Sequence, residues 1–224
     1  MANDRILSTD NEKTDGISDL LEKASDVARR VLGSIQTIAG TTNCKGVQIH
    51  ELKKYATNNG YWIADIDKLG IYSDRGSENE VYISLDGRNV LKLNDFRYSD
   101  DNLNAFFCRI KIHNALFPGC AYTLIGFAEN KNKKICAVLS QPFIHADREA
   151  STEEIAGALA LMGFMPCGNG EYFTNGDIDI FDALPNNVLH GIDGQFYFID
   201  TILFKSDISN LTLYKSLSPR FYNP

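Results

Sequence analysis

Apolar residues near the start of the chain recur at the spacing of helices. Between residues 15 and 40 they return every three or four positions, which predicts an amphipathic helix that Gly40 can end. A shorter helix is predicted within residues 41–60, before an Asn-Asn-Gly stop signal. Residues 1–14 are expected to lack regular structure. The 15–40 helix can pack on the main domain or dock a protein partner, and the sequence leaves both interpretations open.

From residue 61 onward, the pattern changes to short runs rich in β-branched and aromatic residues, which are typical of strands. Turn signals such as Asp86-Gly87 separate these runs. We predict an antiparallel sheet of about five strands within residues 61–144. One helix, from Asp100 to Leu116, interrupts it. The predicted strands lie in residues 60–73, 78–85, 89–95, 121–129 and 134–144.

The rest of the chain, residues 145–224, combines one helix with several short strands. The helix begins at a Ser151 or Thr152 cap and carries acids in its first turn. The Asp193-Gly194 pair predicts a hairpin, and the last residues can add a helical turn. The predicted strands lie in residues 171–175, 177–181, 186–191 and 195–204.

Composition places the chain among ordinary globular proteins. Its 224 residues are 44% hydrophobic and 23% charged, close to the globular average. No apolar run reaches the roughly 18 residues of a membrane-spanning helix, and the polar start lacks the apolar core of a secretion signal. The five cysteines are scattered without a C-x-x-C pair, which favours reduced, mostly buried thiols over a zinc site. We therefore expect a cytoplasmic protein that does not bind membranes.

The net charge of −7 argues against a nucleic-acid-binding protein. The charge is uneven, because no Lys or Arg lies between Arg148 and Lys205. This stretch can be a solvated acidic face, or it can supply oxygen ligands for divalent cations. Its acids are Glu149, Glu153, Glu154, Glu171, Asp177, Asp179, Asp182, Asp193 and Asp200.

The strongest candidate for chemistry is the run from Asp182 to Leu189, which a hairpin and an apolar strand ending at Asp200 follow. Phosphoryl transfer needs these residue types, since a carboxylate orients the attacking hydroxyl while an amide oxygen and a second carboxylate hold magnesium. A bare carboxylate that ends an apolar strand is costly unless it is paired or binds a metal, which singles out Asp200. Asp182 can instead simply begin a turn with Pro185 and Asn186.

These residues give the chain a resemblance to the protein-kinase-like superfamily. Asp182 and Asn187 match the catalytic-loop pattern D-x-x-x-x-N, in a form that resembles aminoglycoside phosphotransferases more than eukaryotic protein kinases. The resemblance implies that Asp182 is catalytic and that Asn187 and Asp200 hold Mg²⁺. The segment Val90–Leu93 resembles the V-A-I-K strand, so Lys92 would be the catalytic lysine that contacts the phosphates of ATP. Lys92 can also be a solvent-facing residue of an alternating strand.

The same resemblance implies the remaining nucleotide contacts. The backbone around Gln141, Phe143 and Ile144 would bind adenine, because this stretch resembles the kinase hinge. Gly76 and Val81 fall where kinases carry a glycine-rich loop. The order of motifs is also similar to the kinase-like domain of bacterial and phage polyvalent proteins. The segments that carry this similarity are His113–Pro118, Gly126-Phe127, Gln141–Phe143, Ile155–Leu159, Gly163-Phe164 and Asn186–Leu189.

Departures from the kinase pattern keep other functions open. Gly76 is the one glycine left in its stretch, where Glu78 and Glu80 would crowd phosphates if they pointed inward. Phe181 stands before the catalytic Asp in place of the usual His-Arg pair, and the 100–116 helix has no glutamate to pair with the lysine. The alternative is therefore a pseudokinase-like module that binds nucleotide or protein without turnover. A third interpretation is an unrelated α+β protein with coincidental motifs.

We expect an α+β, bilobal protein-kinase-like fold. Residues 1–60 would form an N-terminal helical extension, and residues 61–144 an N lobe with an antiparallel sheet and one helix. Residues 145–224 would form a reduced C lobe with the catalytic and metal-binding loops. The expected function is an ATP- and Mg²⁺-dependent phosphotransferase of the serine/threonine/tyrosine kinase type. Its hydroxyl acceptor is unknown and can be a protein or a small molecule.

Overall fold

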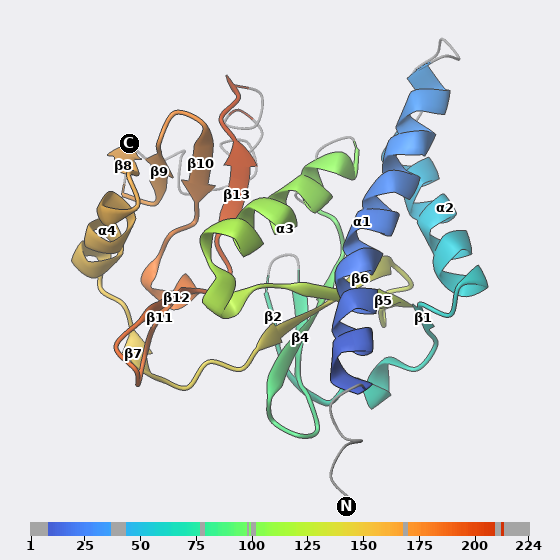
Figure 1. Ribbon diagram of the computed structural model, residues 1–224, viewed down its shortest axis with the longest axis horizontal. Coiled ribbons are helices and arrows are strands. Elements are labelled where there is room, and N and C mark those ends of the chain that lie inside the picture. The colour runs from blue at the N-terminus through green and yellow to red at the C-terminus, as the bar shows by residue number, and fades with distance from the viewer. Residues whose placement is uncertain are drawn as a thin grey trace, which may run out of the picture. The chain divides into compact units, whose positions relative to one another are not determined.

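The computed structural model describes residues 9–36, 44–76, 79–97, 99, 102–167, 170–208 and 212. The chain is a mixed α+β protein and divides into two compact units. Unit 1 takes its described residues from 1–107 and 122–141, and unit 2 from 108–121 and 142–224. The helices drawn in Figure 1 are α1 (Thr9–Gln36), α2 (Cys44–Asn58), α3 (Asn104–Leu116) and α4 (Thr152–Leu161).

Unit 1 contains a six-stranded sheet in the order β1-β5-β6-β4-β3-β2. The pairs β2–β3, β3–β4 and β5–β6 are antiparallel, but β1 runs parallel to β5. Our expectation of a purely antiparallel sheet is therefore wrong at this edge. The strands are β1 (Trp62–Ile63), β2 (Ile71–Arg75), β3 (Asn79–Ile83), β4 (Asn89–Asn94), β5 (Thr123–Glu129) and β6 (Ile135–Pro142).

The run 60–73, which we predicted as one strand, is divided into β1, a 3-10 turn and β2. The turn η1 (Ile66–Lys68) begins because the Asp65 carboxylate accepts a hydrogen bond from the backbone N–H of Asp67 at 3.2 Å. Gly70 follows with a φ of +153°, and its Cα lies against a backbone carbonyl where no side chain fits. Local capping and one glycine thus override an apolar pattern that reads as a continuous strand.

Helices α1 and α2 pack side by side (Figure 1). Small residues are among the buried positions of both helices, since Ala24 and Ala28 of α1 and Ala56 of α2 are fully buried. Helix α1 begins at Thr9, earlier than the predicted start at residue 15, and ends at Gln36. Residues 37–43, which include the predicted Gly40 stop, lie outside the described residues.

One buried side chain connects these helices to the start of α3. Gln48 of α2 is 0% exposed, and its amide Nε2 donates a hydrogen bond of 2.8 Å to the Ala28 carbonyl of α1. Its Oε1 accepts a hydrogen bond of 2.8 Å from the backbone N–H of Leu103, one residue before α3. Helix α3 begins at Asn104 rather than at Asp100, and the predicted residues 100 and 101 lie outside the described residues.

Unit 2 contains two small sheets, with the strand orders β13-β10-β9-β8 and β12-β11-β7. The predicted hairpin at Asp193-Gly194 is confirmed, since β11 and β12 pair antiparallel on either side of it. The strands are β7 (Ala146–Glu149), β8 (Met165–Cys167), β9 (Tyr172–Thr174), β10 (Ile178–Phe181), β11 (Val188–Gly191), β12 (Phe196–Phe198) and β13 (Ile202–Lys205).

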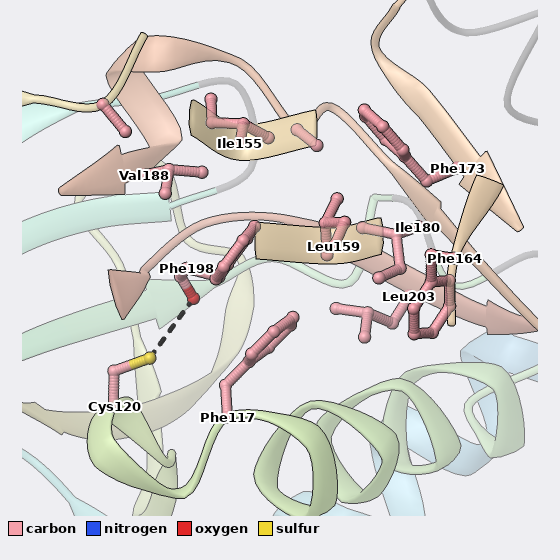
Figure 2. Packing of buried hydrophobic residues seen from close by; sticks show 12 residues of the cluster. Phe117, Cys120, Ile155, Leu159, Phe164, Phe173, Ile180, Val188, Phe198 and Leu203 are labelled. Carbon is pink, nitrogen blue, oxygen red and sulfur yellow. Dashed lines mark hydrogen bonds between the residues drawn. The ribbon is translucent and has the colours of Figure 1, made fainter. Parts of the chain in front are cut away.

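The core of unit 2 forms where α4 meets these strands (Figure 2). Ile155 and Leu159, one turn apart on α4, are fully buried in it, and the Phe117 ring stacks on Phe198 with 4.4 Å between the ring centroids. Ser151 caps α4 in a capping box with Glu154, which confirms one of the two predicted caps.

The structure also bears on the expectations for the cysteines and for membrane-spanning helices. All five cysteines are free thiols, as expected, but only Cys120 and Cys136 are buried, so the expectation that most of them are buried is wrong. Within the part of the chain that the structure describes, no helix is long and apolar enough to cross a membrane. Most of the tail after residue 208, where we predicted a helical turn, lies outside the described residues.

Candidate functional site

Two antiparallel ladders of unit 2 bring the predicted catalytic and metal residues together. In the first, Phe181 of β10 lies opposite Ile202 of β13, and in the second, Val188 of β11 lies opposite Phe198 of β12. Residues 182–187 connect the first ladder to the second, and residues 199–201 connect the second back to the first. Because both connections join the same two ladders, they lie next to each other.

This arrangement corrects the prediction of a single strand over residues 195–204. The chain leaves β12 after Phe198 and enters a different sheet at Ile202, so Asp200 lies in the break between strands. A hydrogen bond of 2.9 Å from the Ile199 N–H to the Asn187 carbonyl ties the two connections directly. Asp182, Asn187 and Asp200 thus belong to one local site.

Asn187 is the last residue of the first connection, residues 182–187, and its side chain bonds back to the start of that connection. Its Nδ2 donates a 2.8 Å hydrogen bond to the backbone carbonyl of Asp182, and the side chain is 6% exposed. The Leu184 N–H donates to the same carbonyl at 2.9 Å. The Oδ1 of Asn187 accepts a hydrogen bond of 2.9 Å from the Asn186 amide. The spacing of five residues in D-x-x-x-x-N is therefore the spacing at which the Asn amide reaches back to the Asp.

Asp182 has a left-handed backbone with φ of +57°. This conformation is uncommon outside glycine, although Asp tolerates it better than most residues do. The preceding Phe181 is fully buried and stacks on Tyr172, with 4.4 Å between ring centroids. Apolar packing on one side and the Asn187 amide on the other hold the residue in this conformation.

Two side chains from the segment before β5 hold the carbonyl of Phe198, two residues before Asp200. The ring Nε2 of His113 donates to the Phe198 carbonyl at 2.8 Å, and Cys120 Sγ donates to the same oxygen at 3.4 Å. His113 is 1% exposed, so it makes a buried polar contact inside unit 2. The sequence did not show that this contact supports the connection that carries Asp200, since residues 113 and 198 are far apart in the chain.

Lys92 lies in the middle of β4 in unit 1 and is 5% exposed. The interpretation of a solvent-facing lysine is therefore wrong. Its Nζ lies 3.3 Å from the Tyr122 hydroxyl and 5.2 Å from the centroid of the Tyr122 ring. A buried ammonium needs such partners, because desolvation of an isolated charge is costly.

The register of unit 1 places Val81 and Gln141 on the sheet face of Lys92. Val81 lies directly opposite Lys92, so the two side chains share a face. Val138 packs in the apolar cluster with Leu91 and Leu93 on the other face, so Gln141, three residues along β6, points to the Lys92 side.

The register also shows where Glu80 points. Glu80 pairs with Leu93, which packs in the apolar cluster, so the Glu80 carboxylate lies on the face opposite Lys92. It does not crowd a phosphate that Lys92 would contact. Glu78, the other acid of this stretch, lies outside the described residues.

The other predicted nucleotide contacts occupy different places. Gly76 lies at the turn between β2 and β3, and its N–H donates to the Asn79 carbonyl at 2.9 Å. Phe143 and Ile144 follow β6 as half-buried residues of unit 2, and the side chain of Ile144 packs against the unit 2 core. The chain passes from unit 1 to unit 2 between Gln141 and Pro142.

The acidic stretch after Arg148 is not one cation site. Asp179 is 2% exposed and accepts hydrogen bonds from the hydroxyls of Thr174 and Ser206, at 2.7 and 2.5 Å. Glu154 accepts two hydrogen bonds from Arg148, and these lower the pKa of its carboxyl to about 2. Among the described residues, no group of three or more His, Cys, Asp or Glu side chains could hold a metal ion.

A magnesium ion that also binds nucleotide phosphates needs fewer than three protein side chains as ligands. One or two carboxylates with phosphates and water are the usual set. Asp200 supplies a half-buried carboxylate, and Asn187 Oδ1 keeps a second lone pair beyond its bond to Asn186. The next residue, Thr201, is 6% exposed, and its hydroxyl has no hydrogen-bond partner within the described residues. These donors fit a magnesium–phosphate group.

A D-x-x-x-x-N loop beside an Asp that follows an apolar strand is typical of the protein-kinase-like class. A family model described as Serine/Threonine/Tyrosine Kinase found in polyvalent proteins matches residues 45–206, and the chain belongs to this family. No curated protein and no solved structure matches the chain. Membership supports a kinase-like, transferase function in broad terms, and kinases in general use a nucleotide and a divalent metal.

Proposed function

We propose that the protein is a small bilobal kinase that transfers the γ-phosphoryl group of ATP to a hydroxyl acceptor. The observation that carries this proposal is the meeting of two connections in unit 2, which brings Asp182, Asn187 and Asp200 together. Residues 61–144 would be the N lobe and residues 145–224 the C lobe, after a helical extension over residues 1–60.

Each residue of the proposed site has one role. The Asp182 carboxylate orients the acceptor hydroxyl and takes its proton. The acceptor oxygen then forms a bond to the γ-phosphorus, the bond from that phosphorus to the β–γ bridging oxygen breaks, and ADP leaves. Asn187 and Asp200 would hold Mg²⁺, which neutralises charge on the phosphates.

The proposed nucleotide contacts come from unit 1 and from the segment after it. Lys92 would exchange its contact with Tyr122 for an oxygen of the phosphates. Val81 and Gly76 would cover the nucleotide from the β2–β3 hairpin. The backbone of Gln141, Phe143 and Ile144 would bind adenine. The buried position of Lys92 and the face it shares with Val81 support this assignment.

A second candidate is a pseudokinase-like module that binds nucleotide or protein without turnover. The contact of Lys92 with Tyr122 favours it, because the hydroxyl and ring already satisfy the ammonium. In that case the lysine belongs to the core of unit 1 and contributes nothing to phosphoryl transfer. A protein partner for the 15–40 helix is compatible with either candidate.

The first experiment is a thermal-shift titration with ATP, with and without Mg²⁺. We expect ATP with Mg²⁺ to raise the melting temperature of the wild type, because a ligand that binds only the folded state stabilises it by mass action. Asp200→Ala should abolish the magnesium-dependent part of the shift. Asp177→Ala is the matched control, since it removes an exposed carboxylate of the same unit outside the site.

Turnover then separates the two candidates. ADP release that Asp182→Asn abolishes, with ATP binding retained, supports the kinase. A magnesium-independent shift that survives Asp200→Ala, without turnover, supports the pseudokinase. An identical response of Asp200→Ala and Asp177→Ala would contradict the assignment of Asp200, and the absence of any shift would contradict nucleotide binding itself.

A further inference from the structure

A groove of about 650 Å³ lies between α1 and α2, the two helices that Figure 1 shows side by side. We call it the hairpin groove. Its apolar floor consists of Val27 and Val31 from α1 and Val47 and Tyr55 from α2. Val47 is 37% exposed, so part of this floor is open to solvent. The groove belongs entirely to unit 1 and uses none of the residues proposed for phosphoryl transfer.

The groove is lined by residues of both helices. On α1 the lining residues Arg30 and Val31 lie three and four positions after Val27, which places all three on one helical stripe. On α2, Val47 and Tyr55 are two turns apart. Two neighbouring helices that present one stripe each form the kind of surface into which a third amphipathic helix packs.

The rim of the groove is positively charged in an acidic chain. Arg30 and Lys54 line the groove itself, and an adjoining hollow that shares Arg30 and Tyr55 adds Lys23 and Arg29. The two carboxylates of this surface form ion pairs within their own helices, Asp26 with Arg29 and Glu51 with Lys54, each at 2.7 Å. Four cations against two carboxylates give a net positive surface, whereas the chain as a whole carries −7.

These ion pairs do not block the rim. The side chains of Arg29 and Asp26 are 63% and 56% exposed, and such pairs contribute little in water. A ligand carboxylate can therefore compete for the cations. Arg side chains bind carboxylates through paired N–H groups, which favours an acidic ligand over a neutral one.

We propose that the hairpin groove docks an acidic, amphipathic helical segment of a partner protein. Its apolar side chains contact the valines and Tyr55 of the floor, and its Asp and Glu side chains contact Arg30 and Lys54 at the rim. The proposal rests on unit 1 alone, so it stands or falls independently of nucleotide binding and turnover.

The test is fluorescence anisotropy with two labelled synthetic peptides of about 18 residues, or five helical turns. One carries Leu at helical spacing with Glu at the remaining positions, and the other carries Lys in place of every Glu. We expect the Glu peptide to bind the full chain with micromolar affinity and the Lys peptide to bind at least tenfold more weakly. Arg30→Glu and Lys54→Glu should each weaken the Glu peptide by tenfold or more, while Arg88→Glu should not.

Arg88 is the matched control because it is an exposed arginine of unit 1 in the β3–β4 turn and lines neither the groove nor the adjoining hollow. The fluorescence of Trp62 in β1 shows that each variant folds. Equal binding of the two peptides, or equal affinities of Arg30→Glu and Arg88→Glu, would overturn the proposal. Self-association of the chain that Arg30→Glu abolishes would assign the groove to a second copy instead, and would also overturn it.

Discussion

Replacement of the buried Gln48 by methionine is expected to destabilise unit 1 by about 1–3 kcal/mol. The Gln48 amide accepts a hydrogen bond from the Leu103 N–H and donates one to the Ala28 carbonyl, both at 2.8 Å, and its side chain is fully buried. Methionine has a similar length and fills the same space, but it offers neither partner. The substitution therefore isolates the hydrogen bonds from the packing.

Loss of the two Gln48 hydrogen bonds lowers the free energy of unfolding by different amounts. The Ala28 carbonyl lies inside α1, where it keeps the bond that every helical carbonyl accepts from the residue four positions later. The Leu103 N–H lies before the first turn of α3, beside a fully buried side chain, and has no such replacement. An orphaned buried donor costs about 1–3 kcal/mol. In a chain of this size, that lowers the melting temperature by about 2–12 °C.

Urea unfolding followed by tryptophan fluorescence measures this cost. The chain has one tryptophan, Trp62 in β1, so the signal reports on unit 1 and not on unit 2. His50→Met is the control, since His50 is exposed on the same helix of unit 1 and should change stability by less than about 0.5 kcal/mol. If Gln48→Met also stays within about 0.5 kcal/mol of wild type, Gln48 does not connect the helices energetically and the reasoning fails.

Three further predictions concern other parts of the molecule. The pKa of Glu154 is lowered from 4.5 to about 2, so its stabilising effect is complete above about pH 4.5 and is lost as the pH falls toward 2. The gap in melting temperature between wild type and Glu154→Gln should close over that window, and a gap that persists at about pH 2 would contradict the assignment. Burial raises the pKa of Cys136 to about 12, so iodoacetamide should label the half-buried Cys167 before Cys136 in the folded chain. Mass spectrometry should find equal labelling of the two only in urea. Gly126→Ala should destabilise by about 1–3 kcal/mol, since its Cβ would lie 2.6 Å from a backbone carbonyl oxygen. The exposed helical Gly157→Ala should instead stabilise by about 0.5–1 kcal/mol, and thermal melts of the two variants decide this.

The elements that the sequence predicts well are those with local signals. Ser151 and Glu154 form the capping box expected from a Ser or Thr cap and first-turn acids, because all its groups lie within four residues. The Asp193-Gly194 turn joins β11 to β12 for the same reason. The helix over residues 15–40 also follows from its own period, although its start at Thr9 lies in a polar stretch that carries no apolar repeat.

The features that the sequence does not predict depend on distant partners. The run from Phe196 to Phe204 is apolar apart from Asp200 and Thr201, which lie at the break between β12 and β13, but the pattern does not show that the two strands belong to different sheets. Gln48 resembles any polar residue of a helix until Ala28 and Leu103 are seen around it. The parallel pairing of β1 rests on two residues, too few for any periodicity.

The packing of the loop around Asp182 explains how the chain can lack the His-Arg pair of the kinase pattern. A His-Arg pair before Asp182 would place a charged side chain where Phe181 is fully buried against Tyr172. Here the position of the loop is set instead by that stacked pair and by the amide of Asn187, which bonds to the Asp182 carbonyl at 2.8 Å. Apolar packing and neutral amide bonds do not change with protonation or salt, as ion pairs do. The loop can therefore keep the geometry of the D-x-x-x-x-N pattern without the charged residues that usually accompany it. Lys92 is then the predicted nucleotide contact that depends on a positively charged side chain.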